Sequence, residues 1–150
     1  MRATVNLESV RAKLATETGL VEVVTIRKSG KPLISVVNAG IILHPGGTHD
    51  VVAFVSLGNA VKLQHLRNRP EITLAVRRGW EWIAVDGTAE LAGPNDPHPD
   101  VAPDAVPGLL RSIFLAAGGT HDDWDEFDRV MVDEQRCAVL ITPDRVYPTS

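Results

Sequence analysis

The chain has 150 residues, one cysteine and a formal net charge of −4 at pH 7. With 44% hydrophobic and 23% charged residues, the composition is that of an ordered single domain over residues 1–150 and excludes a disordered chain. A lone cysteine excludes an intrachain disulfide and a cysteine-based zinc site. Charges are spread without like-charge runs, which argues against a nucleic-acid partner.

Targeting signals are missing from the sequence pattern. The N-terminal segment is broken by charges and lacks the apolar core of a signal peptide. No apolar stretch approaches the roughly 20 residues that a membrane-spanning helix needs. We therefore predict a cytoplasmic protein with no membrane partner.

Apolar periodicity and turn residues divide the chain into short elements. The predicted elements, in chain order, are a helix from Leu7 to Thr18, strands from Leu20 to Arg27, Leu33 to Leu43 and Val51 to Leu57, a helix from Ala60 to Arg69, strands from Glu71 to Arg77 and Trp80 to Leu91, a proline-rich loop from Gly93 to Pro107, helices from Leu109 to Ala117 and Asp122 to Glu134, and a last strand from Cys137 to Thr142. Tight turns between strands favour an antiparallel barrel over a doubly wound parallel sheet. The expected fold class is mainly β (α+β), with six strands and short flanking helices.

The junction of the third strand and the following helix has the residues of a phosphate site. A helix N-terminus offers free backbone N–H groups and a partial positive charge. Ser56 and Asn59 add neutral donors there, and Lys62 adds a cation one turn into the helix. Taken alone, the pattern also fits a simple helix cap at Asn59 with a solvated Lys62.

Two further segments have residues suited to a flat ring. Arg77, Arg78, Trp80 and Trp82 surround a hairpin and could stack on a ring or balance anionic groups. They equally fit a barrel corner or a dimer interface. In the second strand, the small residues around Gly40 would let a ligand approach the backbone, although Gly40 could also mark a bulge.

Other catalytic classes lack their motifs. Histidines 44, 49, 65, 98 and 121 show no metal-binding spacing, and we predict no metal site. A nucleophile elbow and a dinucleotide-binding glycine motif are missing. Cys137 is expected to be a small core residue.

Taken together, four segments resemble the pyridoxamine 5′-phosphate oxidase-like superfamily, and more narrowly its actinobacterial branch that uses coenzyme F420. They are Phe54…Ser56…Lys62…Leu66…Asn68-Arg69-Pro70, Trp82…Val85-Asp86-Gly87-Thr88-Ala89-Glu90, Gly119-Thr120-His121-Asp122-Asp123-Trp124-Asp125-Glu126-Phe127 and Arg136…Pro143-Asp144-Arg145-Val146-Tyr147. Their order and spacing cover nearly the whole chain.

The resemblance implies a split β-barrel homodimer with two cofactor sites at the subunit interface. It implies that Ser56, Asn59, Ala60 and Lys62 surround the cofactor phosphate and that Val36, Val37 and Asn38 lie beside the ring. Arg77, Arg78, Trp80 and Trp82 would reach toward a site, including that of the partner subunit. Ala60 departs from the Ser or Thr of many relatives, so one phosphate donor is absent or is replaced by Asn59.

The function implied by the resemblance is hydride transfer from reduced F420 to a small conjugated or unsaturated substrate. Leu33 and Ile34 stand where the flavin-using oxidases carry an arginine, which argues against the vitamin oxidase. An FMN-binding oxidoreductase and a non-catalytic F420 carrier stay open as alternatives. No side chain is assigned as a catalytic acid or base.

Overall fold

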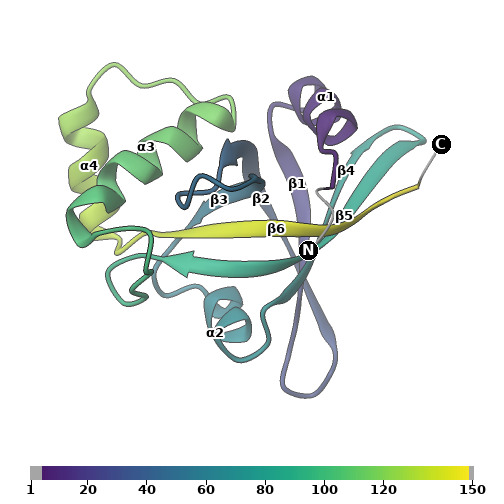
Figure 1. Cartoon of the computed structure of the whole chain (residues 1–150), viewed down its shortest axis with the longest axis horizontal. Coiled ribbons are helices and arrows are strands. Elements are labelled where there is room, and N and C mark those ends of the chain that lie inside the picture. The colour runs from purple at the N-terminus through teal and green to yellow at the C-terminus, as the bar shows by residue number, and fades with distance from the viewer. Residues whose placement is uncertain (1–4, 149–150) are drawn as a thin grey trace.

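The computed structural model describes residues 5–148, whose six strands form a closed antiparallel barrel in the order β1-β2-β3-β6-β5-β4 (Figure 1). The strands are β1 (Leu20–Ile26), β2 (Pro32–Leu43), β3 (Asp50–Ser56), β4 (Glu71–Arg78), β5 (Glu81–Ala92) and β6 (Cys137–Tyr147). The helices are α1 (Glu8–Thr16), α2 (Val61–Asn68), α3 (Val106–Ala116) and α4 (Trp124–Asp133), with a 3-10 turn at Pro103–Ala105. The predicted six-stranded, mainly β barrel is confirmed.

The interior of the barrel is filled by alternate side chains of the strands. Val23, Phe54 and Leu74 are fully or almost fully buried in this cluster. Helices α1 and α2 contribute the apolar residues Val10 and Leu63 to the same cluster. Alternate residues of the strands therefore face one core inside the barrel.

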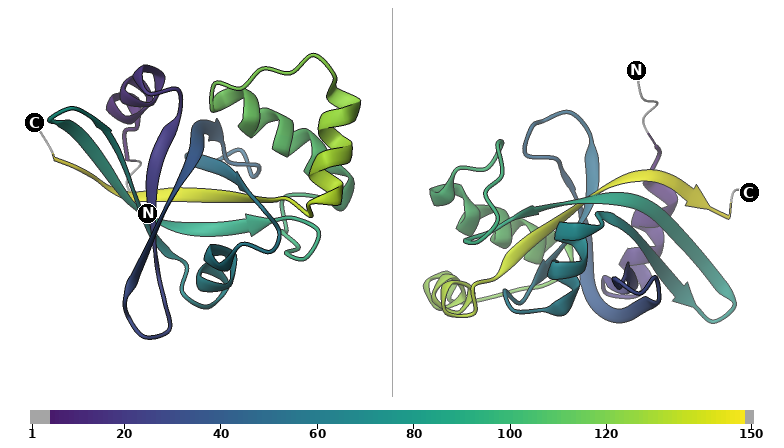
Figure 2. Two further views of the ribbon diagram at one scale, coloured as in Figure 1. Left: turned by 180° about the vertical axis from the view of Figure 1, so that it is seen from behind. Right: turned by 90° about the horizontal axis from the view of Figure 1, so that it is seen from below.

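A second apolar cluster lies outside the barrel, where α3 packs on β2, β3 and β6 and α4 lies beside α3 (Figure 2). Successive residues of β3 are consequently buried on both faces: Val52 joins the interior cluster, whereas Val51 and Ala53 join the outer one. The outer cluster also takes Leu110 from α3 and Phe127 from α4. Both views of Figure 2 place these two helices at the opposite end of the molecule from the tip of the β4–β5 hairpin.

Gly40 sets how closely α3 approaches the sheet. A Cβ atom at Gly40 would lie 2.4 Å from the backbone carbon of Ala116, which is closer than any real contact. Gly40 pairs with Ala53 without a register shift, so it marks no bulge. The space at this glycine is filled by the end of a helix, and not by the ligand that the sequence suggested.

Two element boundaries differ from the prediction by more than two residues. β6 continues beyond Thr142 to Tyr147, because Pro143 lies opposite Gly87 at a register shift in the β5–β6 pairing, where a missing N–H is tolerated. Pro107 belongs to α3 and not to the loop, since proline suits the first turn of a helix.

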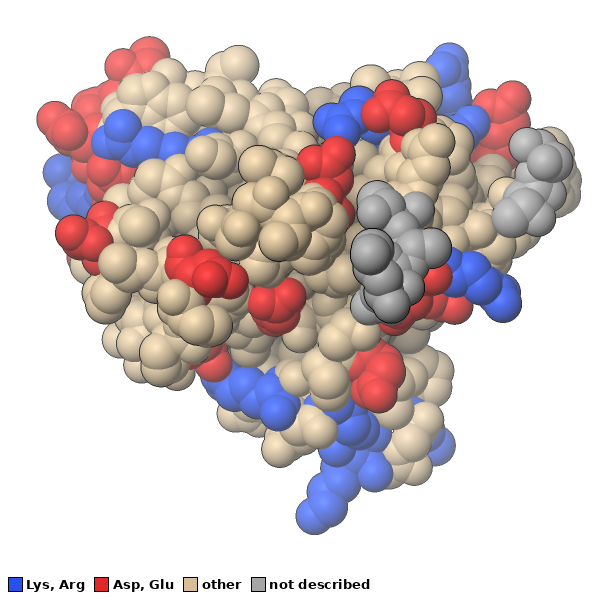
Figure 3. All heavy atoms as spheres, viewed as in Figure 1, with Lys and Arg blue, Asp and Glu red and all other residues tan. Residues whose placement is uncertain are grey.

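None of the helices within residues 5–148 is both long and apolar enough to cross a bilayer. On the face drawn in Figure 3, acidic and basic side chains are intermixed. Basic residues gather at the protruding β1–β2 turn, where Arg27, Lys28 and Lys31 are exposed.

Candidate functional site

A pocket of about 600 Å³ lies between the barrel and the α3–α4 pair. Its barrel wall comes from the middle of β2, the end of β3 and the start of α2, and its other wall comes from α3, α4 and the turn before β6. Six of the predicted cofactor residues line it, namely Val36, Val37, Asn38, Ser56, Ala60 and Lys62. Residues that the sequence pattern placed in two separate segments thus meet in one cavity.

The turn between β3 and α2 places Lys62 at this pocket. Gly58 makes the turn possible, because a Cβ atom there would lie 2.3 Å from the backbone oxygen of Gln135. The Gly58 N–H also donates to the carbonyl of Glu134 at 3.2 Å. This backbone contact between two turns brings Arg136 to the same pocket as Lys62.

Two cations therefore face the pocket. The pKa of Lys62 is lowered from its usual value, first by burial and second by the positive charge of Arg136. Lys62 forms no ion pair with any of residues 5–148, and its ammonium lies 5.8 Å from the centre of the Phe54 ring. An ammonium that is partly desolvated beside a second cation favours an incoming anion.

The hydrogen-bond donors of the Arg136 guanidinium are only partly paired within residues 5–148. One terminal nitrogen, Nη2, lies 3.4 Å from the carboxylate oxygens of Glu134. Its Nε atom is buried and has no hydrogen-bond partner among the described residues. A buried donor without a partner is costly, and an anion in the pocket would be a suitable acceptor.

The beginning of α2 is uncapped. Its N-cap residue is Ala60, no side chain within residues 5–148 caps the first turn, and that turn has no acidic residue. The simple capping role for Asn59 is therefore wrong. Asn59 is exposed and does not line the pocket, whereas the buried Ser56 hydroxyl donates to the carbonyl of Leu57 at 3.0 Å.

The β2 wall of the pocket is largely apolar. Val36 is exposed on the barrel surface, and Val37 packs against the barrel core. The Asn38 amide donates to the carbonyl of Thr18 at 2.9 Å, which holds the side chain in place. Such a wall suits the face of a planar ring.

The structure does not bring the hairpin residues to this pocket. Arg77 and Arg78 end β4, and Trp80 and Trp82 lie at and just after the β4–β5 turn, at the far end of the molecule (Figure 2). Trp80 is 99% exposed, and the one ring contact of Trp82 within residues 5–148 is an edge contact with Tyr147 at 6.2 Å between ring centres. Any role of these four residues at a cofactor site needs a second subunit.

Sequence reasoning missed the residues that the helical wall contributes. Phe114 and His121 line the pocket, and their rings lie 6.4 Å apart in an edge-to-face contact. The sequence analysis included Arg136 only as the first residue of the C-terminal segment that resembles the family. Nothing in its local spacing links it to Lys62.

No family model matches the chain. Several solved structures share its architecture. A conserved hypothetical protein of Mycobacterium tuberculosis matches with a TM-score of 0.65 and 16% identity, over 97% of this chain and 87% of that one. The chain has the split β-barrel fold of the pyridoxamine 5′-phosphate oxidase-like proteins.

Two further split barrels have informative names. A protein described as an F420 reductase matches with a TM-score of 0.59 and 13% identity, over 87% of this chain and 90% of its own. A pyridoxamine 5′-phosphate oxidase-related, FMN-binding protein of Nostoc punctiforme matches with a TM-score of 0.64 and 14% identity, over 96% and 83% respectively. At such identities the likeness establishes the split-barrel fold.

Proposed function

We propose that this split barrel is an oxidoreductase that binds coenzyme F420 and transfers hydride from its reduced form to a small conjugated or unsaturated substrate. The observation that carries the proposal is that Lys62 and Arg136 face the same pocket. Lys62 forms no ion pair with any of residues 5–148, and Arg136 has only the long contact with Glu134. The cations and the uncapped start of α2 fit the phosphate group of the cofactor. The full-length sequence resemblance favours F420 over other flavin-like groups.

Different residues of the pocket would hold different parts of such a cofactor. Lys62, Arg136 and the first N–H groups of α2 would hold the phosphate, and Val36 and Val37 would face the ring. Bound F420 supplies hydride from its C5 carbon, so the protein needs to orient the ring and exclude water. We assign no catalytic acid or base, and the proton would come from solvent or from the substrate.

The proposal includes a homodimer with the cofactor sites at its interface. Ile34 and Val36 are 63% and 62% exposed on the same outer face of β2, which is unusual for large apolar side chains on a strand. Trp80 makes no ring contact with any of residues 5–148. A second subunit would bury these residues and would bring the β4–β5 hairpin, with Arg77, Arg78, Trp80 and Trp82, to the neighbouring pocket.

Fluorescence quenching of F420 by the purified protein tests the proposal. We expect binding at micromolar concentration and about 10- to 100-fold weaker binding for Lys62→Ala and for Arg136→Ala, because each removes a charge-assisted contact worth roughly 1.5–3 kcal/mol. Lys31→Ala is the matched control, since Lys31 is an exposed lysine of the β1–β2 turn. No quenching by the wild-type protein, or equal affinities for all three variants, would contradict the proposal.

Two alternative functions predict different behaviour of the same purified protein. An FMN-binding oxidoreductase is favoured by the name of the Nostoc relative and by the phosphate-like site, and it would purify as a yellow protein or bind FMN more tightly than F420. A carrier would bind F420 without turnover of any enone, quinone or tetrapyrrole substrate. The lack of an assigned acid–base pair in the pocket supports testing the carrier directly.

A further inference from the structure

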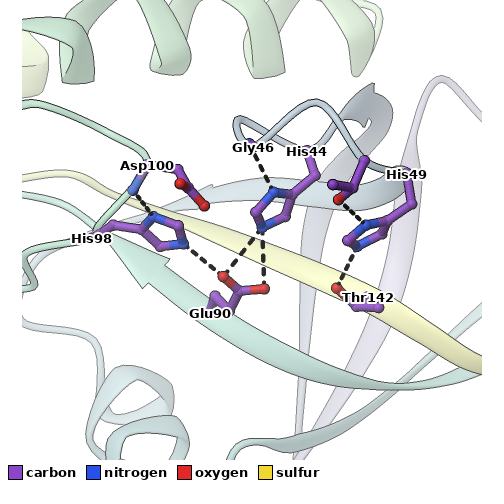
Figure 4. Close-up of polar contacts among 8 residues, drawn as sticks. His44, Gly46, His49, Glu90, His98, Asp100 and Thr142 are labelled. Carbon is purple, nitrogen blue, oxygen red and sulfur yellow. Dashed lines mark hydrogen bonds and ion pairs between the residues drawn. The ribbon is translucent and has the colours of Figure 1, made fainter. Parts of the chain in front are cut away.

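Three metal-ligating side chains converge at a place separate from the cofactor pocket (Figure 4). They come from three segments: His44 follows β2, Glu90 lies in β5, and His98 belongs to the proline-rich loop. The His44 Nε2 atom is 3.2 Å from each carboxylate oxygen of Glu90, and the His98 Nε2 atom is 2.6 Å from one of them. One ligand atom from each of the three residues can be chosen so that all lie within 4.8 Å of one another.

The burial of the three residues differs in a way that suits cation entry. The side chains of His44 and His98 are only 7% and 4% exposed, whereas that of Glu90 is 39% exposed. His49 stacks on His44 at 4.9 Å between ring centres and is held by Thr142 at 2.9 Å. The imidazoles are thus held in position, and the carboxylate leaves an approach from solvent.

Both imidazoles are oriented by the same local turn. His44-Pro45-Gly46 and His98-Pro99-Asp100 share the pattern His-Pro-x. In each, Nδ1 accepts the N–H of the residue two positions later, at 2.9 Å from Gly46 and 3.0 Å from Asp100. A ring nitrogen that accepts carries no proton, so the proton is on Nε2 and is donated to Glu90.

We propose that His44, Glu90 and His98 bind one divalent first-row transition-metal ion, with Zn²⁺ as the cation to test. Two imidazole nitrogens and one carboxylate oxygen suit Zn²⁺ and disfavour Mg²⁺ and Ca²⁺, which prefer oxygen ligands. Three protein ligands leave at least one position for water or another small ligand.

Metal binding requires a proton shift within each ring. Coordination through Nε2 needs the neutral tautomer with its proton on Nδ1, so the turn hydrogen bonds from Gly46 and Asp100 must open. Each imidazole keeps one proton, and no net proton is released by the histidines. Two backbone hydrogen bonds are weak compared with a set of metal–ligand bonds, so this rearrangement does not prevent binding.

The bound ion would join two loops to the barrel. Glu90 is on β5, while His44 and His98 are on the β2–β3 turn and the proline-rich loop. His98 also lines a second pocket of about 500 Å³, which the proline-rich loop borders. None of the three residues lines the candidate cofactor pocket, so the metal proposal is independent of the cofactor proposal.

Calorimetric titration of the chelator-treated full chain with Zn²⁺ tests the site. We expect one Zn²⁺ per chain for the wild type and at least tenfold weaker binding for Glu90→Gln and His98→Ala. Glu90→Gln retains the shape of the side chain but removes its charge. The matched control is His121→Gln, because His121 makes the same kind of turn contact, with the Asp123 N–H at 3.0 Å, away from the three ligands; it should bind like the wild type.

Amide NMR spectra of the wild type keep the test decisive even if a variant fails to fold. On addition of Zn²⁺, the amide signals of Gly46 and Asp100 should shift as they lose their acceptors, while that of Asp123 should stay in place. Absence of stoichiometric binding, unshifted Gly46 and Asp100 amides, or full binding by folded Glu90→Gln would overturn the proposal and leave the three residues as a hydrogen-bonded clamp.

Discussion

Lys62 is the residue whose charge state most directly controls the candidate cofactor pocket. Burial and the nearby Arg136 lower its pKa below the usual 10.5, so the ammonium loses its proton at a lower pH than an exposed lysine. The protonated form is the one that attracts a phosphate. Affinity for F420 should therefore fall as the pH rises through the lowered pKa.

Lys62→Arg separates this effect from other pH effects, because a guanidinium stays charged over the whole range. We expect the wild-type Kd for F420 to rise as the pH approaches the lowered pKa of Lys62 from below, before an exposed lysine would lose its proton, and the Kd of Lys62→Arg to change much less. Fluorescence titration at several pH values measures both. Parallel pH profiles for the two proteins would mean that the ammonium does not contact the anion.

At the residue scale, the sequence predicted the part of the site that is local. Ser56, Ala60 and Lys62 lie within one strand–turn–helix segment, so their proximity follows from spacing alone. Arg136 was missed because its approach depends on the contact of Gly58 with Gln135, which are distant in sequence. His44 and His98 were set aside as metal ligands for the same reason, since local spacing does not show that they meet at Glu90.

At the scale of elements, the proline-rich loop is held to the barrel by an ion pair with α2. Arg67 binds Asp96 through two hydrogen bonds, at 2.8 Å from Nε and 2.7 Å from Nη2. The hydrogen bond from Arg67 is the largest cause that lowers the pKa of Asp96. This pair stabilises the fold at pH values above the ordinary Asp pKa of 3.8, and its contribution is lost as the pH falls through the lower pKa of the folded state.

Asp96→Asn should therefore lower the free energy of unfolding by roughly 1–2 kcal/mol near neutral pH, and by less in acid. Urea unfolding at both pH values measures the difference. Asp122→Asn is the matched control, because Asp122 is exposed before α4 and its side chain forms no hydrogen bond or ion pair with any of residues 5–148. A stability loss that does not shrink in acid would show that the carboxylate charge is not its source.

The start of α4 was predictable from local chemistry, whereas the end of β6 was predicted wrongly because strand pairing decides it. The helix start before Trp124 follows from its acidic residues, and the Asp123 side chain indeed accepts the N–H of Glu126 at 3.1 Å. The extension of β6 past Pro143 depends on its partner strand β5 and its register shift. Closure of the barrel by β1 with β4 and by β3 with β6 likewise lies beyond local patterns.

For the whole molecule, the exposed apolar face of β2 provides a test of the proposed dimer. The double change Ile34→Glu and Val36→Glu places two charges on a face that we expect to be buried between subunits, so the variant should be a monomer. Analytical ultracentrifugation measures the mass. The matched control is Val132→Glu on α4, where the side chain is 68% exposed.

The single change Ile34→Glu should also weaken F420 binding if the cofactor site includes the partner subunit, because Ile34 itself does not line the pocket. A wild-type protein that sediments as a monomer at all concentrations would contradict the dimer while leaving the pocket within one subunit intact. A double variant that remains dimeric would locate the interface elsewhere.

Gly40 has a consequence for how this pocket can change. At Gly40 the main chain of β2 lies directly on the main chain at the end of α3, with no side chain between them. Gly40 itself does not line the pocket, so exchanging pocket residues that lie away from it would leave this backbone contact in place. The close approach of helix and sheet at Gly40 and the chemistry of the pocket wall are thus set by different residues.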